Sequence, residues 1–229
     1  IFIIAKMKIL LSKFIVMLMF ECIYSQKFTT KDKWGTYKDG KYSITNDIWG
    51  TNAGPQTLYV NSHKDWWIHA SHPDGNNVKA YAHVAYDVNK KLSAIKHVSS
   101  SFGVTVPNSG KFNSAYDIWA DNHKYEIMLW MNHHGDASPL GSVVTQATVG
   151  GHSWNVNRGT NGKNEVFSFV RTNNINSGSV DILAVMKWIK SKGWFGDVTL
   201  GDVQFGWEIF STAGKSLEFK VTNFDVTSG

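Results

Sequence analysis

Cysteine is almost absent from this sequence of 229 residues, which contains one, Cys22, and no Asn-x-Ser/Thr triplet. A single thiol cannot form a disulfide within the chain, and without that triplet no N-linked glycan is expected. The folded protein must therefore depend on packing for its stability, which a chain of this length can provide.

Long apolar runs are also lacking. The main one extends from Ile9 to Phe20, follows two lysines, and is too short to span a bilayer comfortably. A charged start, an apolar run and the small residue Ser25 predict a secretory signal peptide over residues 1–25, with a membrane anchor as the alternative. Residues 26–229 are then expected to be extracellular, without membrane attachment.

Clusters of positive charge are missing as well. The chain has 23 basic and 18 acidic residues, a formal charge of +5, and residues 26–229 keep 20 basic and 17 acidic residues, or +3. A mild excess without any Lys/Arg block argues against a nucleic-acid-binding surface. We therefore expect no nucleic-acid partner.

Aromatic residues, in contrast, are abundant, with 10 Trp, 8 Tyr and 13 Phe in a chain that is 42% hydrophobic. Such a composition can build a large core, and all-β sandwiches of this length commonly form one domain. No internal repeat, linker or low-complexity tail divides the sequence. We predict a single domain over residues 26–229, with the rings shared between a core and a surface that stacks on sugars.

Short candidate strands, separated by Gly, Asn, Asp and Pro turns, occur throughout this domain. They cover residues 42–49, 57–60, 66–69, 79–87, 93–104, 112–119, 125–131, 143–149, 152–157, 165–172, 203–210 and 217–226. Many short strands with turn signals between them predict a β-sandwich or a barrel.

One segment, from Ser179 to Lys192, has a helical pattern instead. Its apolar residues repeat at helical spacing, at Ile182, Val185, Met186 and Ile189. Ser179 is the expected N-cap, and Asp181 is expected in the first turn. The apolar stripe should pack on the outer sheet, although a partner-binding face is the alternative.

Two strands each place one glutamate opposite an apolar row. Side chains alternate along a strand, so Glu126 and Glu208 point away from the rows 125, 127, 129, 131 and 203, 205, 207, 209. An unpaired buried carboxylate costs several kcal/mol, so these faces should line a wet cleft. Paired carboxylates across a cleft are what glycosidic-bond hydrolysis requires. The alternative is that each glutamate is a half-exposed strand residue with a lysine partner.

Several motifs occur along the chain in the order that they have in a known family. They are NDIWG at 46–50, NNVKAY at 76–81, YDIW at 116–119, YEIMLW at 125–130, GDASPLG at 135–141, GGHSW at 150–154 and QFGWE at 204–208. With these motifs the chain resembles glycoside hydrolase family 12, the secreted endo-β-1,4-glucanases and xyloglucanases.

The resemblance implies an all-β, concanavalin-like jelly roll of two curved antiparallel sheets with one α-helix on the convex side. It also implies an endo-acting retaining enzyme, monomeric and without a cofactor, that cleaves β-1,4-glucosidic bonds in cellulose, xyloglucan or mixed-linkage β-glucan. Glu126 is then the expected nucleophile, Glu208 the general acid/base, and Asp117 the carboxyl beside the nucleophile. Because such close carboxyls cannot all ionise easily, one of them should hold a proton.

Four further residues are expected to contact the sugar chain by the same resemblance. Trp49 matches a tryptophan that stacks on a glucosyl ring, and Asn113 and Met128 match residues of the cleft. Asp47 stands where relatives often have Asn, which puts a carboxylate in the place of an amide. An ordinary packing role is the alternative for each.

Adjacent histidines, His133 and His134, do not predict a metal site. Neighbouring residues of a strand point to opposite faces, and no third ligand has suitable spacing. A sugar contact or a plain loop is expected there. The alternative function for the whole chain is a non-catalytic glycan-binding jelly roll, but two carboxylates on facing strands favour the enzyme.

Overall fold

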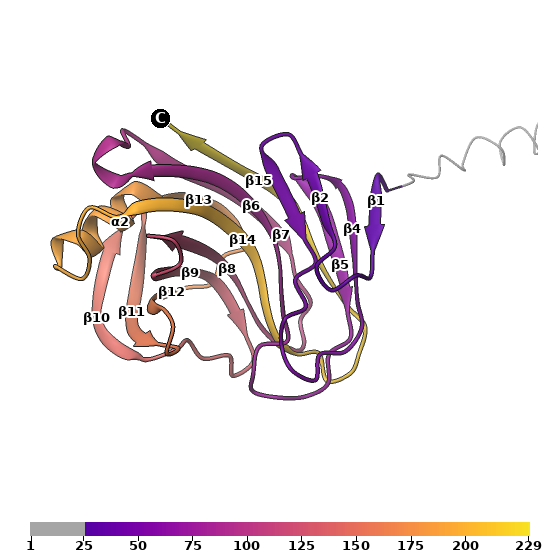
Figure 1. The fold of residues 1–229 in the computed structure, drawn as a ribbon. Helices are drawn as coiled ribbons and strands as arrows, with labels where there is room; N and C mark the ends of the chain where they lie inside the picture. Colours follow the sequence, from indigo (N-terminus) through magenta and orange to yellow (C-terminus); the bar gives the residue numbers. More distant parts are fainter. Residues whose placement is uncertain (1–25) are drawn as a thin grey trace, which may run out of the picture.

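Two β-sheets packed face to face make up the computed structural model, which describes residues 26–229 (Figure 1). The signal peptide predicted over residues 1–25 lies outside the described residues. Within residues 26–229, no helix has the length and apolar character needed to cross a bilayer.

The smaller sheet has six strands. In spatial order they are β1 (Phe28–Thr30), β4 (Gln56–Ser62), β5 (Asp65–Ala70), β15 (Leu217–Ser228), β7 (Val98–Thr105) and β13 (Ser177–Asp181). This sheet forms the outer layer, on the convex side of the larger sheet (Figure 1).

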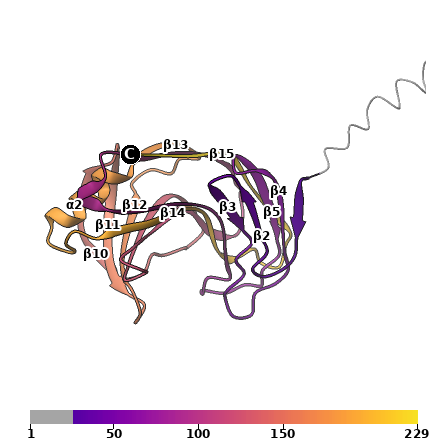
Figure 2. The same cartoon turned by 45° about the horizontal axis from the view of Figure 1, so that its top comes forward.

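The larger sheet has nine strands. In spatial order they are β10 (Ser142–Val149), β11 (His152–Thr160), β12 (Glu165–Arg171), β9 (Tyr125–His134), β8 (Lys111–Ala120), β14 (Thr199–Ser211), β6 (Ala80–Lys91), β3 (Tyr42–Thr45) and β2 (Thr36–Asp39). Its long strands bend into an arch, which is seen from a second direction in Figure 2. The predicted jelly roll of two curved sheets is thus confirmed.

All twelve predicted strands are present, and three further strands were missed. Strands β1 and β2 lie in the polar segment before the first prediction, and β13 is rich in Ser and Gly, so none has a strong alternation signal. The strand predicted over residues 93–104 begins at Val98, because residues Leu92–Ala94 form a short 3₁₀ helix, η1.

One pair of strands departs from the expected antiparallel pattern, since β12 pairs parallel with β9. After β9 the chain crosses to the far edge of the sheet, forms β10, and returns through the antiparallel strands β11 and β12. Two reversals bring the chain back beside β9 in its original direction.

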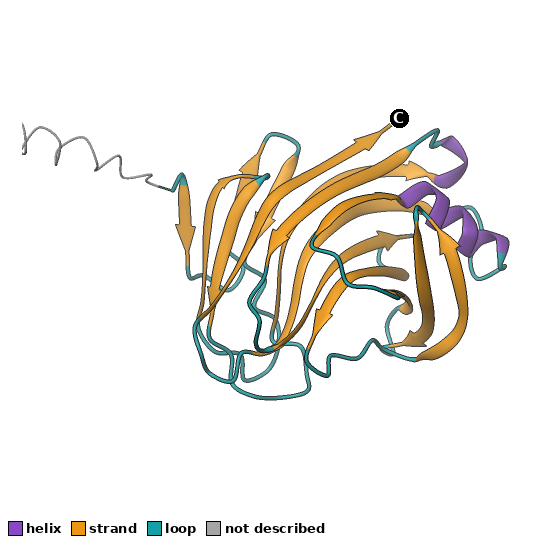
Figure 3. Ribbon diagram, turned by 180° about the vertical axis from the view of Figure 1, so that it is seen from behind, coloured by secondary structure: helices purple, strands orange, loops and turns teal. Residues whose placement is uncertain are grey.

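One α-helix, α2 (Ile182–Ser191), occurs among the described residues (Figure 3). It packs against β7 and β10 and buries Ile182, Val185, Met186 and Ile189, as the spacing predicts. The predicted N-cap was wrong, because Ser179 lies within β13. The cap is Asp181, whose side chain accepts a hydrogen bond of 2.9 Å from the backbone N–H of Ala184.

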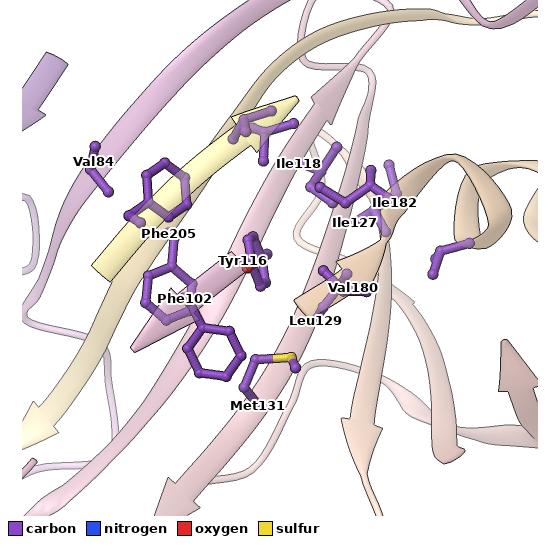
Figure 4. Packing of buried hydrophobic residues seen from close by; sticks show 14 of the residues in the cluster. Val84, Phe102, Tyr116, Ile118, Ile127, Leu129, Met131, Val180, Ile182 and Phe205 are labelled. Carbon is purple, nitrogen blue, oxygen red and sulfur yellow. The ribbon is translucent and has the colours of Figure 1, made fainter. Parts of the chain in front are cut away.

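The main core lies between the two sheets and includes the buried face of α2. The apolar rows of β9 and β14 both enter it, and Figure 4 shows Ile127, Leu129 and Phe205 gathered with Phe102 of β7. Trp207 of β14 is fully buried against Trp66 of the outer sheet, with ring centroids 5.0 Å apart. Because these rows occupy the convex face, their alternate side chains must point into the concave face.

Candidate active site

Three neighbouring strands, β9, β8 and β14, carry the acidic side chains of the concave face. Strand β8 lies between the other two and pairs antiparallel with both. Glu126 of β9 lies opposite Trp119 of β8, and Glu208 of β14 lies opposite Asn113. Residues that lie opposite each other point to one face. Since positions 113, 117 and 119 of β8 differ by even numbers, Glu126, Glu208 and Asp117 share the concave face.

A second, smaller apolar cluster forms part of this concave face, separate from the main core. Its buried members are Ala115, Met128, Trp130, Ala137, Val166 and Phe210. Met128 is only 5% exposed and lies opposite Asp117 across the β8–β9 ladder. The acidic groups therefore stand on a partly apolar floor, which limits their contact with water.

Glu208 has a defined hydrogen-bond partner. The side-chain amide of Asn113 donates to Oε2 of Glu208 over 2.6 Å, and Oδ1 of Asn113 accepts from the backbone N–H of Glu208 over 3.4 Å. Burial raises the pKa of Glu208 to about 7, and the hydrogen bond from Asn113 opposes part of that rise. Glu208 can consequently hold a proton near neutral pH.

Glu126 and Asp117 interact electrostatically with each other and with Glu208. Burial raises the pKa of Glu126 to about 7, and the negative charge of Glu208 contributes to the rise. The pKa of Asp117 lies well above its ordinary value, because Asp117 is buried and faces the charges of Glu126 and Glu208. Its Oδ1 finds no hydrogen-bond partner among residues 26–229. All three carboxyls thus have pKa values above their ordinary values, and it stays a prediction that one of Glu126 and Asp117 holds a proton.

The segment after β3 brings Asp47 and Trp49 to the rim of the concave face. Its backbone is tied to β6, since the carbonyl of Asp47 accepts from the N–H of Tyr81 over 2.9 Å. Trp49 is 50% exposed, as a ring that stacks on a ligand must be. Asp47 Oδ2 lies 3.5 Å from Nδ1 of His83, and burial raises the pKa of Asp47 to about 6, with Lys33 opposing.

A second exposed tryptophan beside this rim was missed by the sequence analysis. Trp34 is 59% exposed, and its neighbours Lys33 and Gly35 accept backbone hydrogen bonds of 3.0 Å from Ile48 and Asn46. Trp34 lies in the polar segment before the first predicted strand, where no periodic pattern singles it out. Its backbone neighbours thus lie beside the segment that carries Trp49.

The two adjacent histidines point in different directions, as expected. His134 stacks on Phe112 with ring centroids 5.4 Å apart, and its Nδ1 lies 2.8 Å from the carbonyl oxygen of Gly110. His133 lies beside Trp130, with ring centroids 6.3 Å apart. Over residues 26–229, no three His, Cys, Asp or Glu side chains gather as metal ligands.

Comparisons with known proteins identify the family of this chain. Residues 40–228 match the family model for glycosyl hydrolase family 12. A probable xyloglucan-specific endo-beta-1,4-glucanase A of Aspergillus terreus is 32% identical over 210 residues, covering 81% of this chain and 82% of that protein.

Solved structures identify the same family. The xyloglucanase domain of NopAA, a type three effector from Sinorhizobium fredii in complex with cellobiose, has a TM-score of 0.86 and 38% identity, covering 90% of this chain and 100% of that one. The family 12 xyloglucanase of Bacillus licheniformis has a TM-score of 0.79 and 28% identity, covering 88% of this chain and 100% of its own. Sequence motifs, fold and the grouping of the carboxylates thus lead to one assignment, and the chain belongs to glycosyl hydrolase family 12.

Proposed function

We propose that this protein is an endo-acting β-1,4-glucanase that works by double displacement with retention. The observation that carries the proposal is the placement of two buried carboxyls, Glu126 and Glu208, on one concave face, with a third carboxyl, Asp117, between them on β8. Carboxyls that flank a glycosidic bond can act as nucleophile and acid/base.

Each carboxyl has a distinct role in this mechanism. Glu126 attacks the anomeric carbon and forms a glycosyl-enzyme, while Glu208 gives its proton to the departing glycosidic oxygen. Glu208 then removes a proton from the water that releases the sugar. Asp117 remains protonated beside Glu126, and its proton limits the charge that accumulates as Glu126 ionises.

The substrate is a β-glucan, with xyloglucan as the proposed main substrate, because the relatives and neighbours named above are called xyloglucan-specific endoglucanase or xyloglucanase. Trp49 provides a stacking surface at the rim, and we propose that Asp47 and Met128 contact the chain in the cleft. Asn113 was expected to contact it too, but its side chain is fully buried and acts through its hydrogen bond to Glu208. The leader pattern supports secretion, and we propose that the mature enzyme acts outside the cell as a monomer.

A hydrolysis panel tests this function against a glycan-binding protein without turnover. The wild-type protein should release reducing ends from xyloglucan, mixed-linkage β-glucan or a soluble cellulose derivative, and Glu126→Gln should bind the same polysaccharides without hydrolysing them. Equal binding by both proteins, with no reducing ends from either, would show a binding protein.

Retention predicts the configuration of the first product. Two inversions at one carbon restore the β configuration, so NMR spectra taken before mutarotation should show new reducing ends as the β-anomer. The measurement is a time course of the anomeric proton signals after addition of concentrated enzyme. New ends that appear first as the α-anomer would rule out Glu126 as the attacking group.

The alkaline limb of the pH profile should depend on the protonation of Glu208. Activity requires Glu208 protonated, and the hydrogen bond from Asn113 lowers the pKa of Glu208. Asn113→Ala should therefore raise that pKa and move the alkaline limb of kcat/KM to higher pH. Asn61→Ala, on β4 of the outer sheet, is the matched control and should leave the limb in place. A limb that moves to lower pH in Asn113→Ala would contradict the assigned hydrogen bond.

A further inference from the structure

The segment between β3 and β4, residues 46–54, carries Trp49 and contains neither helix nor strand. Its backbone takes left-handed φ angles at Asp47 (41°) and Asn52 (54°). A segment without a ladder of its own keeps its place through hydrogen bonds at particular points. The position of the Trp49 ring therefore depends on where the two ends of this segment are held.

Both ends of the segment meet at one buried side chain, the imidazole of His72, which has no exposed surface. At the far end, the backbone N–H of Gly54 donates to Nδ1 of His72 over 3.1 Å. At the near end, Nε2 of His72 lies 3.0 Å from Oε1 of Gln56. The amide of Gln56 in turn donates to the backbone carbonyl of Asn46 over 2.7 Å and to its Oδ1 over 2.9 Å. One imidazole thus connects the first residue of the segment with its last.

The direction of these hydrogen bonds fixes the tautomer of the ring. A backbone N–H can only donate, so Nδ1 of His72 carries no proton and the neutral ring has its proton on Nε2. That proton is donated to Gln56, and the chain of donors ends where the amide of Asn46 donates to the carbonyl of Asp32 over 3.0 Å. An imidazolium would direct a second N–H at the N–H of Gly54. Only the neutral ring can therefore hold both ends.

The surroundings of the ring keep it neutral. Burial lowers the pKa of His72 to about 4, and the positive charge of Lys79 adds to the decrease. Lys79 is itself buried, and its ammonium group donates to the carbonyl of Thr51, within the segment, over 3.1 Å. Gln56 and Thr212, which bond to His72 from β4 and from the chain after β14, are uncharged. The required form of the ring is thus present near neutral pH.

The backbone of His72 is fixed to the strand that carries Glu208. Strand β14 ends at Ser211, and the residues that follow it bond to His72. The N–H of His72 donates to Oγ1 of Thr212 over 2.9 Å, and its carbonyl accepts from the N–H of Thr212 over 3.2 Å and from that of Gly214 over 2.9 Å. His72 therefore ties the rim segment to the end of the strand that bears the proposed acid/base.

We propose that His72 is a positioning residue for substrate binding, whose imidazole holds both ends of residues 46–54 and so fixes Trp49 relative to Glu208. His72 touches no substrate in this role and acts through the segment. The inference rests on the proposed function, because it presumes that a β-glucan chain stacks on Trp49. A positioning role differs from a purely structural one in its effect on KM.

Two conservative replacements each keep one contact of the ring. The side-chain oxygen of Asn can replace Nδ1 and the amide nitrogen of Gln can replace Nε2, so His72→Asn should free the Gln56 end and His72→Gln the Gly54 end. Each should raise KM for a soluble β-glucan roughly three- to tenfold, with kcat within about twofold of wild type, because a misplaced stacking surface weakens binding of substrate and transition state alike. His72→Leu keeps neither contact and should raise KM further.

His152→Gln is the matched control. His152 also bonds to a backbone carbonyl, that of Ser179, with its Nε2 at 2.8 Å. It lies on β11, near the opposite end of the larger sheet from β3. His152→Gln should leave KM unchanged even where it lowers the melting temperature. An unchanged KM in both His72→Asn and His72→Gln would show a purely structural histidine and overturn the proposal, whether or not His72→Leu folds.

A double-mutant cycle tests whether His72 acts through Trp49. Trp49→Ala should itself raise KM by roughly tenfold, since the stacking surface is lost. In that background His72→Gln should change KM by less than about twofold, because no ring is left to misplace. A rise in KM as large as in the protein that keeps Trp49 would overturn the proposal.

The possible results separate this inference from the proposed function. A wild-type protein that hydrolyses no β-glucan refutes the function itself. Hydrolysis by the wild type, with the same KM in Trp49→Ala, overturns the stacking role of Trp49 and this inference with it. Hydrolysis with a raised KM in Trp49→Ala, but not in His72→Asn and His72→Gln, overturns the role of His72 alone.

Discussion

Replacing Glu126 with alanine should abolish turnover of natural β-glucans, with a loss in kcat of at least about 10⁴-fold. Without the carboxylate no glycosyl-enzyme can form, and water has no activating base on that face of the sugar. The folded state should survive, because Glu126 lies on the cleft side of β9 and the apolar row of that strand remains intact. Release of reducing ends and the far-UV circular dichroism spectrum are the two measurements.

A small anion should restore part of the activity of this variant. Azide enters the space left by the carboxylate and attacks the anomeric carbon, while Glu208 still protonates the leaving oxygen, so the product is the α-glycosyl azide. Glu165→Ala is the control, because Glu165 is an exposed carboxylate at the start of the neighbouring strand β12, where it pairs with Arg158 over 2.8 Å. Full activity in Glu126→Ala, or a β-azide product, would contradict the nucleophile assignment.

Replacing Glu208 with alanine should produce the second largest loss, and its size should depend on the leaving group. Natural glucans need a proton on the departing oxygen, so their kcat/KM should fall by about 10²- to 10⁴-fold. Aryl glycosides with acidic phenols need no such help in the first step. They should keep that step and accumulate a glycosyl-enzyme, since no base then activates water.

A burst of phenol, followed by slow turnover, is the result to look for with this variant. The alkaline limb of the wild-type profile, set by the raised pKa of Glu208 at about 7, should also disappear from the first step. A variant that loses natural and activated substrates to the same extent would show that Glu208 holds the structure of the cleft instead of donating a proton. Wild-type activity that kept rising to about pH 9 would contradict the assignment of any carboxyl group as the general acid.

Much of the site could be predicted because β-strands alternate strictly. In β9 and β14 the residues on either side of Glu126 and Glu208 belong to the buried core, so the period of two assigned both glutamates to the opposite face. The order of short motifs then related them to a family. Trp49 belongs to one of those motifs and has a half-exposed ring, and Asn113 donates a hydrogen bond to Glu208; their contacts with a sugar chain stay predictions.

Other features depend on contacts between distant segments and could not be predicted. Nothing in the sequence of β12 indicates that it pairs parallel with β9 instead of antiparallel. The closeness of Asp47 to His83 depends on the bend after β3. The N-cap of α2 was assigned two residues early because Ser179 and Asp181 are both good capping residues.

The burial of Trp207 next to Glu208 links catalysis to the melting of the whole protein. Trp207 contacts both Trp66 and Phe219 of the outer sheet, so β14 cannot shift without separating the two layers. A lid or a surface loop can loosen on warming while the rest of a protein stays folded, but a central strand shared with the core has no such freedom. Heating should therefore inactivate this enzyme in one cooperative step, with activity lost at the temperature at which the sandwich itself unfolds.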